Sequence, residues 1–173
     1  MKTTLITTLL LGMCMATSSQ QINNSTINTF DLDRYLGKWY EIARYDHAFE
    51  RDLVGTTAEY TLLKDGKIKV LNSGYLNTLD GPYVESIGKA KPNKNEQPGQ
   101  LRVSFFGPFY NDYYILDLAP DYSYSIVGSS SPKYLWILSR TPQLTTTVKE
   151  NILSKLHQRG YDTNKLLWVE QKE

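Results

Sequence analysis

Few side chains in this 173-residue chain are of the types that catalyse reactions or bind metals at useful spacings. The two histidines, His47 and His157, lie far apart, and the single cysteine, Cys14, falls in an apolar run near the N-terminus. A protein zinc site needs a cluster of Cys, His or acidic ligands, and a nucleophilic triad needs a base beside its Ser or Cys. Since neither pattern is present, we expect no metal, no cofactor and no enzymatic activity.

The carboxylate in the most unusual setting is Glu41, within the stretch GKWYEIARY at residues 37–45. If this stretch is a strand, alternation places Glu41 on the same side as Trp39. A carboxylate buried among apolar side chains has a raised pKa unless a cation pairs with it. Two interpretations stay open: Glu41 is a hydrogen-bonded structural acid, or it contacts a polar group of a ligand.

The composition is that of an ordinary globular protein, and the length fits one domain. Lys and Arg number 19 against 18 Asp and Glu, so the charge gives no basis for capturing nucleic acid, and we expect no such partner. The 13 tyrosines favour strands, and they also suit sites that combine an apolar body with a polar tip.

Residues 1–18 have the features of a secretory signal peptide, with a basic start, an apolar run too short to span a bilayer, and small residues after it. Residues 19–29 are polar and are expected to form a flexible tether, and residues 30–173 to form the folded domain. Cys14 has two interpretations. Either it is a chance residue removed with the signal peptide, or it becomes the acylated first residue of a membrane-anchored lipoprotein.

Beyond residue 30 the chain consists mainly of short runs with period-two alternation, separated by turn residues. Eight runs predict strands at 37–46, 55–63, 67–76, 83–91, 100–106, 112–119, 123–128 and 133–139. Even spacing and short loops favour an antiparallel up-and-down meander, and closure removes the exposed edges. The expected fold is therefore an all-β, eight-stranded barrel, either filled with side chains or holding one small ligand.

One α-helix is expected after the strands, with Thr141 as its N-cap, Pro142 at its first position and Gly160 beyond its end. An apolar stripe predicts that this helix packs on the outside of the barrel, through Leu144, Val148, Ile152, Leu153 and Leu156. Residues 31–37 predict a short helical turn before the first strand, and residues 166–170 predict a last strand.

These features resemble the lipocalin family, and within it the bacterial lipocalins related to apolipoprotein D. Gly37-Lys38-Trp39 matches the first family motif, Arg140 at the end of the eighth strand matches the third, and the second is degenerate. The resemblance covers about residues 30–170. It implies that the Arg140 guanidinium lies over the Trp39 ring, a contact worth about 1–2 kcal/mol, and bonds the backbone of the N-terminal turn. Gly37, Trp39 and Arg140 are thus expected to be structural.

With Trp39 placed inward by the resemblance, alternation gives the other inward positions. The expected ligand-contacting residues are Glu41, Ala43, Ala58, Tyr60, Val70, Asn72, Gly74, Ser86, Gly88, Ala90, Val103, Phe105, Tyr114, Leu116, Val127, Trp136 and Leu138. Several are small where a filled core would carry larger side chains, and apolar walls with a few polar groups are typical of a small-molecule pocket. We expect a cavity for a fatty acid, lysophospholipid or similar lipid; the alternative is a largely filled barrel.

Two further groups bear on function. His47, Arg51 and Lys91 are candidates for holding a polar head group at the mouth. The aromatic loop at residues 105–114 either packs a turn or presents a patch for a membrane or a second copy of the chain.

The function expected from the sequence is non-enzymatic binding, storage or transport of a lipid-like ligand in the bacterial cell envelope, in the periplasm or at the outer membrane. The chain is expected to be a monomer or a homodimer. The alternatives are an envelope interaction protein that uses residues 105–114, and a lipocalin-type enzyme.

Overall fold

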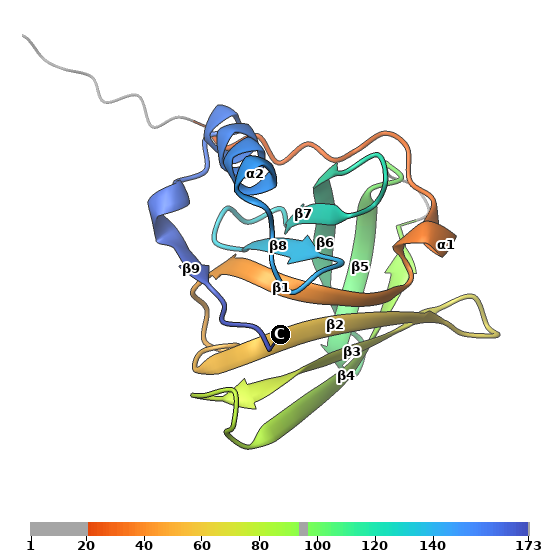
Figure 1. Ribbon diagram of the computed structural model, residues 1–173. Coiled ribbons are helices and arrows are strands. Elements are labelled where there is room, and N and C mark those ends of the chain that lie inside the picture. The colour runs from red at the N-terminus through yellow and green to blue at the C-terminus, as the bar shows by residue number, and fades with distance from the viewer. Residues whose placement is uncertain (1–20, 94–96, 173) are drawn as a thin grey trace, which may run out of the picture.

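The structure, a computed structural model, describes residues 21–93 and 97–172; the expected signal peptide and Cys14 lie outside the described residues. Within them, nine antiparallel strands form one sheet (Figure 1). The strands are β1 (Gly37–Tyr45), β2 (Leu53–Leu62), β3 (Ile68–Leu76), β4 (Tyr83–Pro92), β5 (Gln100–Phe106), β6 (Phe109–Leu118), β7 (Tyr124–Gly128), β8 (Leu135–Ser139) and β9 (Leu166–Trp168).

Strand β1 closes this sheet into a barrel. Its first half pairs with β2, with Gly37 opposite Tyr60, while its other edge pairs with β8, with Glu41 opposite Leu138. The strands β2 to β8 pair in sequence order, so the predicted eight-stranded up-and-down barrel is confirmed.

The C-terminal segment completes the seam between β1 and β2. Where β1 no longer pairs with β2, β9 takes over, with Ala43 opposite Trp168. Beyond β9, the Gln171 side-chain amide donates to the carbonyl oxygens of Glu41 and Thr56, at 2.7 and 3.0 Å. One side chain thus joins the two strands where their own ladder has ended.

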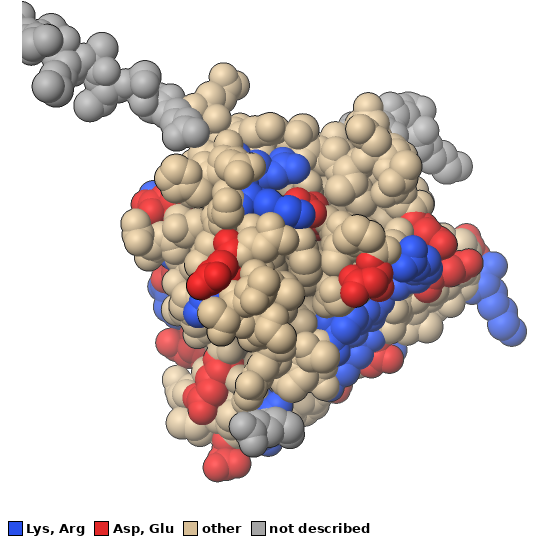
Figure 2. All heavy atoms as spheres, turned by 45° about the horizontal axis from the view of Figure 1, so that its top comes forward, with Lys and Arg blue, Asp and Glu red and all other residues tan. Residues whose placement is uncertain are grey.

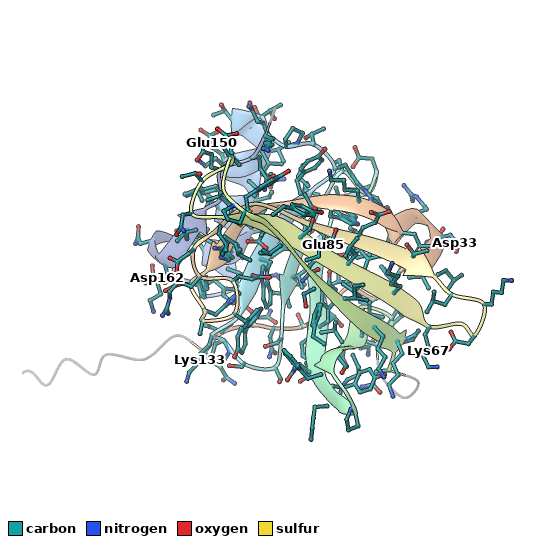
Figure 3. All side chains as sticks on the ribbon, turned by 90° about the horizontal axis from the view of Figure 1, so that it is seen from below. Asp33, Lys67, Glu85, Lys133, Glu150 and Asp162 are labelled. Atoms are coloured by element: carbon teal, nitrogen blue, oxygen red, sulfur yellow. The ribbon has the colours of Figure 1, made fainter. Side chains whose placement is uncertain are left out.

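The barrel has two different ends. At one end lie the short helix α1 (Leu32–Tyr35) and the β2–β3, β4–β5 and β6–β7 turns. At the other lie the β1–β2, β3–β4, β5–β6 and β7–β8 loops. In Figure 3, Asp33 of α1 and Lys67 after the β2–β3 turn mark the first end, and Lys133 of the β7–β8 loop marks the second. We call them the closed end and the open end.

The helix α2 (Thr146–Gln158) lies outside the barrel, and the short 3-10 helix η1 (Thr163–Lys165) follows it (Figure 1). In α2, the buried Ile152 and Leu156 join an outer core with Ile126, Leu135 and Ile137, as the apolar stripe predicted. Gly160, at φ +84°, follows the helix end as expected. None of the helices in the part of the chain that the structure describes is long and apolar enough to span a membrane.

The predicted start of this helix is wrong by four residues. Thr145, not Thr141, is the N-cap, and its hydroxyl accepts from the Val148 N–H. The Thr141 hydroxyl instead donates to the Gln143 carbonyl at 2.7 Å, which holds it in a local turn. Pro142 therefore lies before the helix rather than at its first position.

The expected flexible tether at residues 19–29 is also wrong for most of its length. The Asn23 N–H donates to the Arg159 carbonyl at 2.9 Å and the Ile27 N–H to the Ile115 carbonyl at 3.0 Å. Arg159 in turn donates to the carbonyls of Asn23 and Ser25. Polar composition suggested an unbound segment, but here its backbone groups satisfy those of β6 and of the end of α2.

Candidate ligand-binding site

The closed end is plugged by the pair that the resemblance implied. The Arg140 guanidinium lies 3.8 Å from the centre of the Trp39 ring. Its N–H groups donate to the carbonyls of Lys38, Arg34 and Leu36 at 2.7–2.9 Å. The Trp39 ring N–H donates to the Tyr35 carbonyl at 2.8 Å. Arg140 thus joins the end of β8 to α1 and to the start of β1.

Above this plug, three tyrosines form the floor of the interior. The Tyr113 hydroxyl lies 2.8 Å from that of Tyr35 and 2.9 Å from that of Tyr60, and Tyr35 also donates to Ser125. Burial raises the pKa of Tyr35 to about 12 and the pKa of Tyr60 still further. The floor is therefore polar but uncharged.

The interior has a packed half and an accessible half. Buried side chains that face inward fill the closed half: Trp39, Tyr60, Ile68, Val70, Ala90, Leu101, Ile115, Val127 and Leu138. Toward the open end the inward row runs across the strands from Ala58 through Asn72 to Ser86. Ala58 and Asn72 are partly exposed and Ser86 is exposed. Solvent therefore reaches the inner wall of β2, β3 and β4.

Most of the expected inward residues lie on this inner surface. Val103, Phe105 and Trp136 pack against the inner core. Gly88 stands opposite Val70, and Gly74 shares the face of Asn72. A Cβ at Gly88 would lie 2.8 Å from the Phe105 ring, so a glycine is required for that ring to lie against β4.

The inward placement of Ala43 is wrong, because β1 contains a bulge. The register with β8 shifts between Glu41 and Ala43. Both Ile42 and Ala43 consequently lie in the outer core, and Arg44, opposite Trp136, takes the inward position. Simple alternation carried past the bulge assigned the wrong face.

Tyr114 and Leu116 are also misplaced, since both pack with the outer core beneath α2. Tyr113 and Ile115 face inward instead. This part of β6 is apolar on both faces, because one lines the barrel and α2 covers the other, so the pattern could not identify the inner one.

The open half holds a cluster of buried charged groups that the sequence did not place together. The Arg44 guanidinium donates to Glu41 Oε1 at 2.7 Å and to the Glu50 carbonyl at 2.7 Å. The Trp136 ring N–H donates to Glu50 Oε2 at 3.0 Å, and His47 Nε2 lies 3.1 Å from the same oxygen. All four ionisable side chains are buried. The cluster holds the β1–β2 loop against β8 at the mouth.

The electrostatics of this cluster favour a proton or a cation. Burial raises the pKa of Glu41 to about 8, the Glu50 carboxylate adds to the rise, and Arg44 opposes it. The guanidinium pairs directly only with the Glu41 carboxyl, while the Glu50 carboxylate is bonded by Trp136 and lies beside His47. Arg44 was missed because the bulge reverses its face, and Glu50 because a loop carries it. The available signal was the four charged residues close together in EIARYDHAFE.

The expected head-group residues do not meet at the mouth. His47 is buried and stacks on Phe49, with ring centres 3.9 Å apart. Lys91 lies toward the closed end, with its ammonium 4.3 Å from the Tyr110 ring centre, so its expected place at the mouth is wrong. Arg51 is exposed in the β1–β2 loop and donates to Asp46 at 3.3 Å.

A hollow of about 270 Å³ lies where β4 and β5 separate near the open end, lined by Ile87, Gly88, Lys89, Ser104, Phe105 and Gly107. The two strands pair only from Lys89 opposite Ser104 toward the closed end. A second hollow of about 440 Å³ lies outside the plug, between residues 27–34 and the β6–β7 turn. In the described ranges, no group of three or more His, Cys, Asp or Glu side chains is arranged so that it could hold a metal ion.

Comparison with known proteins gives a consistent assignment. A sequence model of the Lipocalin-like domain matches residues 30–171. The chain is 45% identical over 147 residues to the outer membrane lipoprotein Blc of Vibrio cholerae, covering 84% of this chain and 85% of the relative. It is 35% identical over 142 residues to rat apolipoprotein D, covering 78% and 69%.

Solved structures share the fold. Insecticyanin from the tobacco hornworm superposes with a TM-score of 0.69 at 24% identity, covering 86% of this chain and 84% of that one. The closed barrel, the Arg140–Trp39 plug and the external helix agree with this likeness. On these grounds the chain belongs to the lipocalin family.

Proposed function

We propose that this protein binds a single-chain amphipathic lipid in the open half of its barrel and stores or transports it unchanged. The observation that carries the proposal is Ser86, which lies on the inner face of β4 and is nevertheless exposed. An inner wall that is lined by small side chains, is partly apolar and is reached by solvent is suited to a ligand rather than to a packed core.

The driving force is burial of the ligand's hydrocarbon chain, at about 0.8 kcal/mol for each CH₂ group removed from water. Val103, Phe105 and Trp136 supply an apolar wall, and the ring of Trp136 carries the contact to Glu50. The ligand's polar group would then lie near the Glu41–Arg44–Glu50 cluster, where Arg44 bonds the Glu41 carboxyl and the Glu50 backbone carbonyl.

The cluster supports binding rather than catalysis. Arg44 already bonds Glu41 and two backbone carbonyls, and His47 lies against Glu50 and Phe49. These side chains bond one another, and we assign no catalytic step to them. We therefore propose a non-enzymatic role.

We place the protein in the bacterial envelope, anchored by acylated Cys14. Support comes from the bacterial relatives, which are named outer membrane lipoproteins, and from the apolar run before Cys14. Intact mass measurement of protein purified from its host tests this: a chain that begins at Cys14 and carries acyl groups is expected, and a chain that begins after residue 14 contradicts it.

Titration of a fluorescent single-chain lipid tests the binding proposal. Ser86→Phe fills the inner wall and is expected to weaken binding at least about tenfold, whereas Glu85→Phe adds the same ring to the outer face of β4 and should leave binding unchanged (Figure 3). Failure of the wild-type protein to bind saturably, or equal weakening by both variants, would contradict the proposal.

A further inference from the structure

The most exposed aromatic rings of this protein gather at one end. Phe106 is 80% exposed and Phe109 76%, on either side of the β5–β6 turn, and Phe49 in the β1–β2 loop is 63% exposed. Phe106 and Phe109 of the aromatic loop therefore do not pack a turn, whereas Phe105 and Tyr113 pack against the inner core. Large apolar side chains exposed together at one end of a protein often mark an interaction surface.

The chain also leaves the barrel at this end. The Asn24 side-chain amide donates to the carbonyls of Ser129 and Ser130, in the β7–β8 loop. Asn23 is held by Arg159 just beyond α2. The described part of the chain therefore begins beside the β7–β8 loop, at the open end.

Covalent geometry limits how far the barrel can lie from an anchor at Cys14. Seven residue steps separate Cys14 from Gln21, and a chain spans at most about 3.6 Å per residue, so the reach is at most about 25 Å. An anchor this close, joined beside the β7–β8 loop, brings the open end rather than the closed end toward the bilayer.

We propose that the open end docks on the surface of a lipid bilayer, with Phe49, Phe106 and Phe109 inserted among the lipids and the barrel mouth facing them. This orientation rests on the anchor proposed above, while the exposed phenylalanines are an independent observation. Lipids then pass between the bilayer and the barrel without crossing open water.

The charged residues at the open end indicate whether docking requires anionic lipids. The β1–β2 loop carries exposed Asp46, Arg51 and Asp52, the β3–β4 loop Asp80 and the β7–β8 loop Lys133. On the face in Figure 2, basic and acidic side chains are likewise interspersed. Docking is therefore expected on zwitterionic lipid and with little dependence on salt, because apolar insertion rather than attraction of opposite charges drives it.

The hollow between β4 and β5 lies beside the inserting loop, since Gly107 and Phe105 line it. Its lining includes the exposed Ile87 and also Phe105, which packs against the inner core. A lipid chain leaving the bilayer at the β5–β6 turn would meet this hollow first.

The orientation is tested with the acylated full-length protein on phosphatidylcholine vesicles. An environment-sensitive dye is attached at Pro108→Cys, in the β5–β6 turn, or at Lys64→Cys, in the β2–β3 turn of the closed end; both positions are exposed. We expect a blue shift and quenching by lipid-borne quenchers at position 108 only. Equal signals at both positions, or none, would overturn the proposal.

The role of the rings is tested by lipid uptake. Phe106→Ser/Phe109→Ser is expected to slow transfer of a fluorescent lysolipid from vesicles about tenfold or more, with unchanged affinity for the probe in solution. Leu62→Ser/Leu63→Ser removes apolar side chains that are 44% and 40% exposed at the closed end and should leave transfer unchanged. Equal transfer rates in the two variants would contradict the proposal.

Two other outcomes separate the proposals. If the probe does not bind in solution, the binding function fails, while the dye positions still report the orientation. If the dye at position 108 shifts without vesicles and with rising protein concentration, a second copy covers the rings and the bilayer proposal is wrong.

Discussion

The two ends of the barrel bury polar groups in opposite ways. At the closed end, Arg140 faces only backbone carbonyls and an aromatic ring, and the tyrosine hydroxyls bond one another. At the open end, Arg44 is shared between the carboxylate of Glu41 and the loop that carries Glu50. Arg140 thus donates to uncharged backbone carbonyls at the closed end, and Arg44 donates to a titratable carboxyl group at the open end.

Because of this difference, we expect the two ends to respond differently to pH. Bonds to carbonyls and rings do not change between pH 5 and pH 8, whereas a buried carboxylate pair can take up a proton. We therefore expect the closed end to hold the barrel together under all these conditions and the open end to be sensitive to pH.

The largest effect is expected from Arg44→Met. Removing the guanidinium leaves the Glu41 carboxyl buried without its cationic partner, and breaking a buried ion pair in this way destabilises proteins by about 3–5 kcal/mol. The loss should be greater at pH 8 than at pH 5, because protonation of Glu41 relieves it. Chemical denaturation at the two pH values measures this, and equal losses would show that the cluster is not electrostatically coupled.

Arg140→Ala is expected to destabilise by about 3 kcal/mol, through loss of the ring contact and of charge-assisted bonds to three carbonyls. The melting temperature should fall by roughly 6–12 °C, equally at pH 5 and pH 8. Arg140→Lys, which keeps the charge but not the fork, should lie between. An unchanged melting temperature in Arg140→Ala would disprove the structural role of the plug.

A matched pair on β4 compares packing at the two ends directly. Ala90 is buried in the inner core, so Ala90→Leu overpacks it and should destabilise by about 1–3 kcal/mol. Ser86→Leu, on the same face nearer the open end, should change stability by less than about 0.5 kcal/mol. Similar losses at both positions would mean that the barrel is filled throughout.

The pH dependence of stability tests Glu41 itself. Its pKa of about 8 in the folded state exceeds the ordinary value of 4.5, so the folded state binds more protons in between, and stability falls as pH rises through this range. The slope should reach at most about 1.4 kcal/mol per pH unit. Glu41→Gln should flatten it, and an unaltered slope in that variant would assign the dependence elsewhere.

Sequence patterns were sufficient for the fold because the strands are short, regular and separated by clear turn residues. The Arg140–Trp39 contact followed from the resemblance, and the apolar stripe of α2 from helical periodicity. The start of α2 did not follow, since both Thr141 and Thr145 are competent N-caps and only tertiary context chooses between them.

The inner surface was predictable only where strands are regular. On β3 and β4, alternation placed Asn72 and Ser86 correctly relative to Ala58. It failed at Ala43, because no local pattern marks the bulge, and at Leu116, because α2 makes both faces of β6 apolar. Glu50 was beyond reach, since its position depends on how a loop folds over the mouth.

The seam at β1 also determines when the barrel can close. Gln171 lies 130 positions after Glu41, and it joins β1 to β2 only after almost the whole chain has been made. Until then one edge of β1 stays without its β9 partner, and an unpaired edge is a template for association with other chains. Contacts this distant in sequence also form slowly. Closure is therefore a late event in the life of each molecule, and the interval before it is when the chain most needs protection by chaperones.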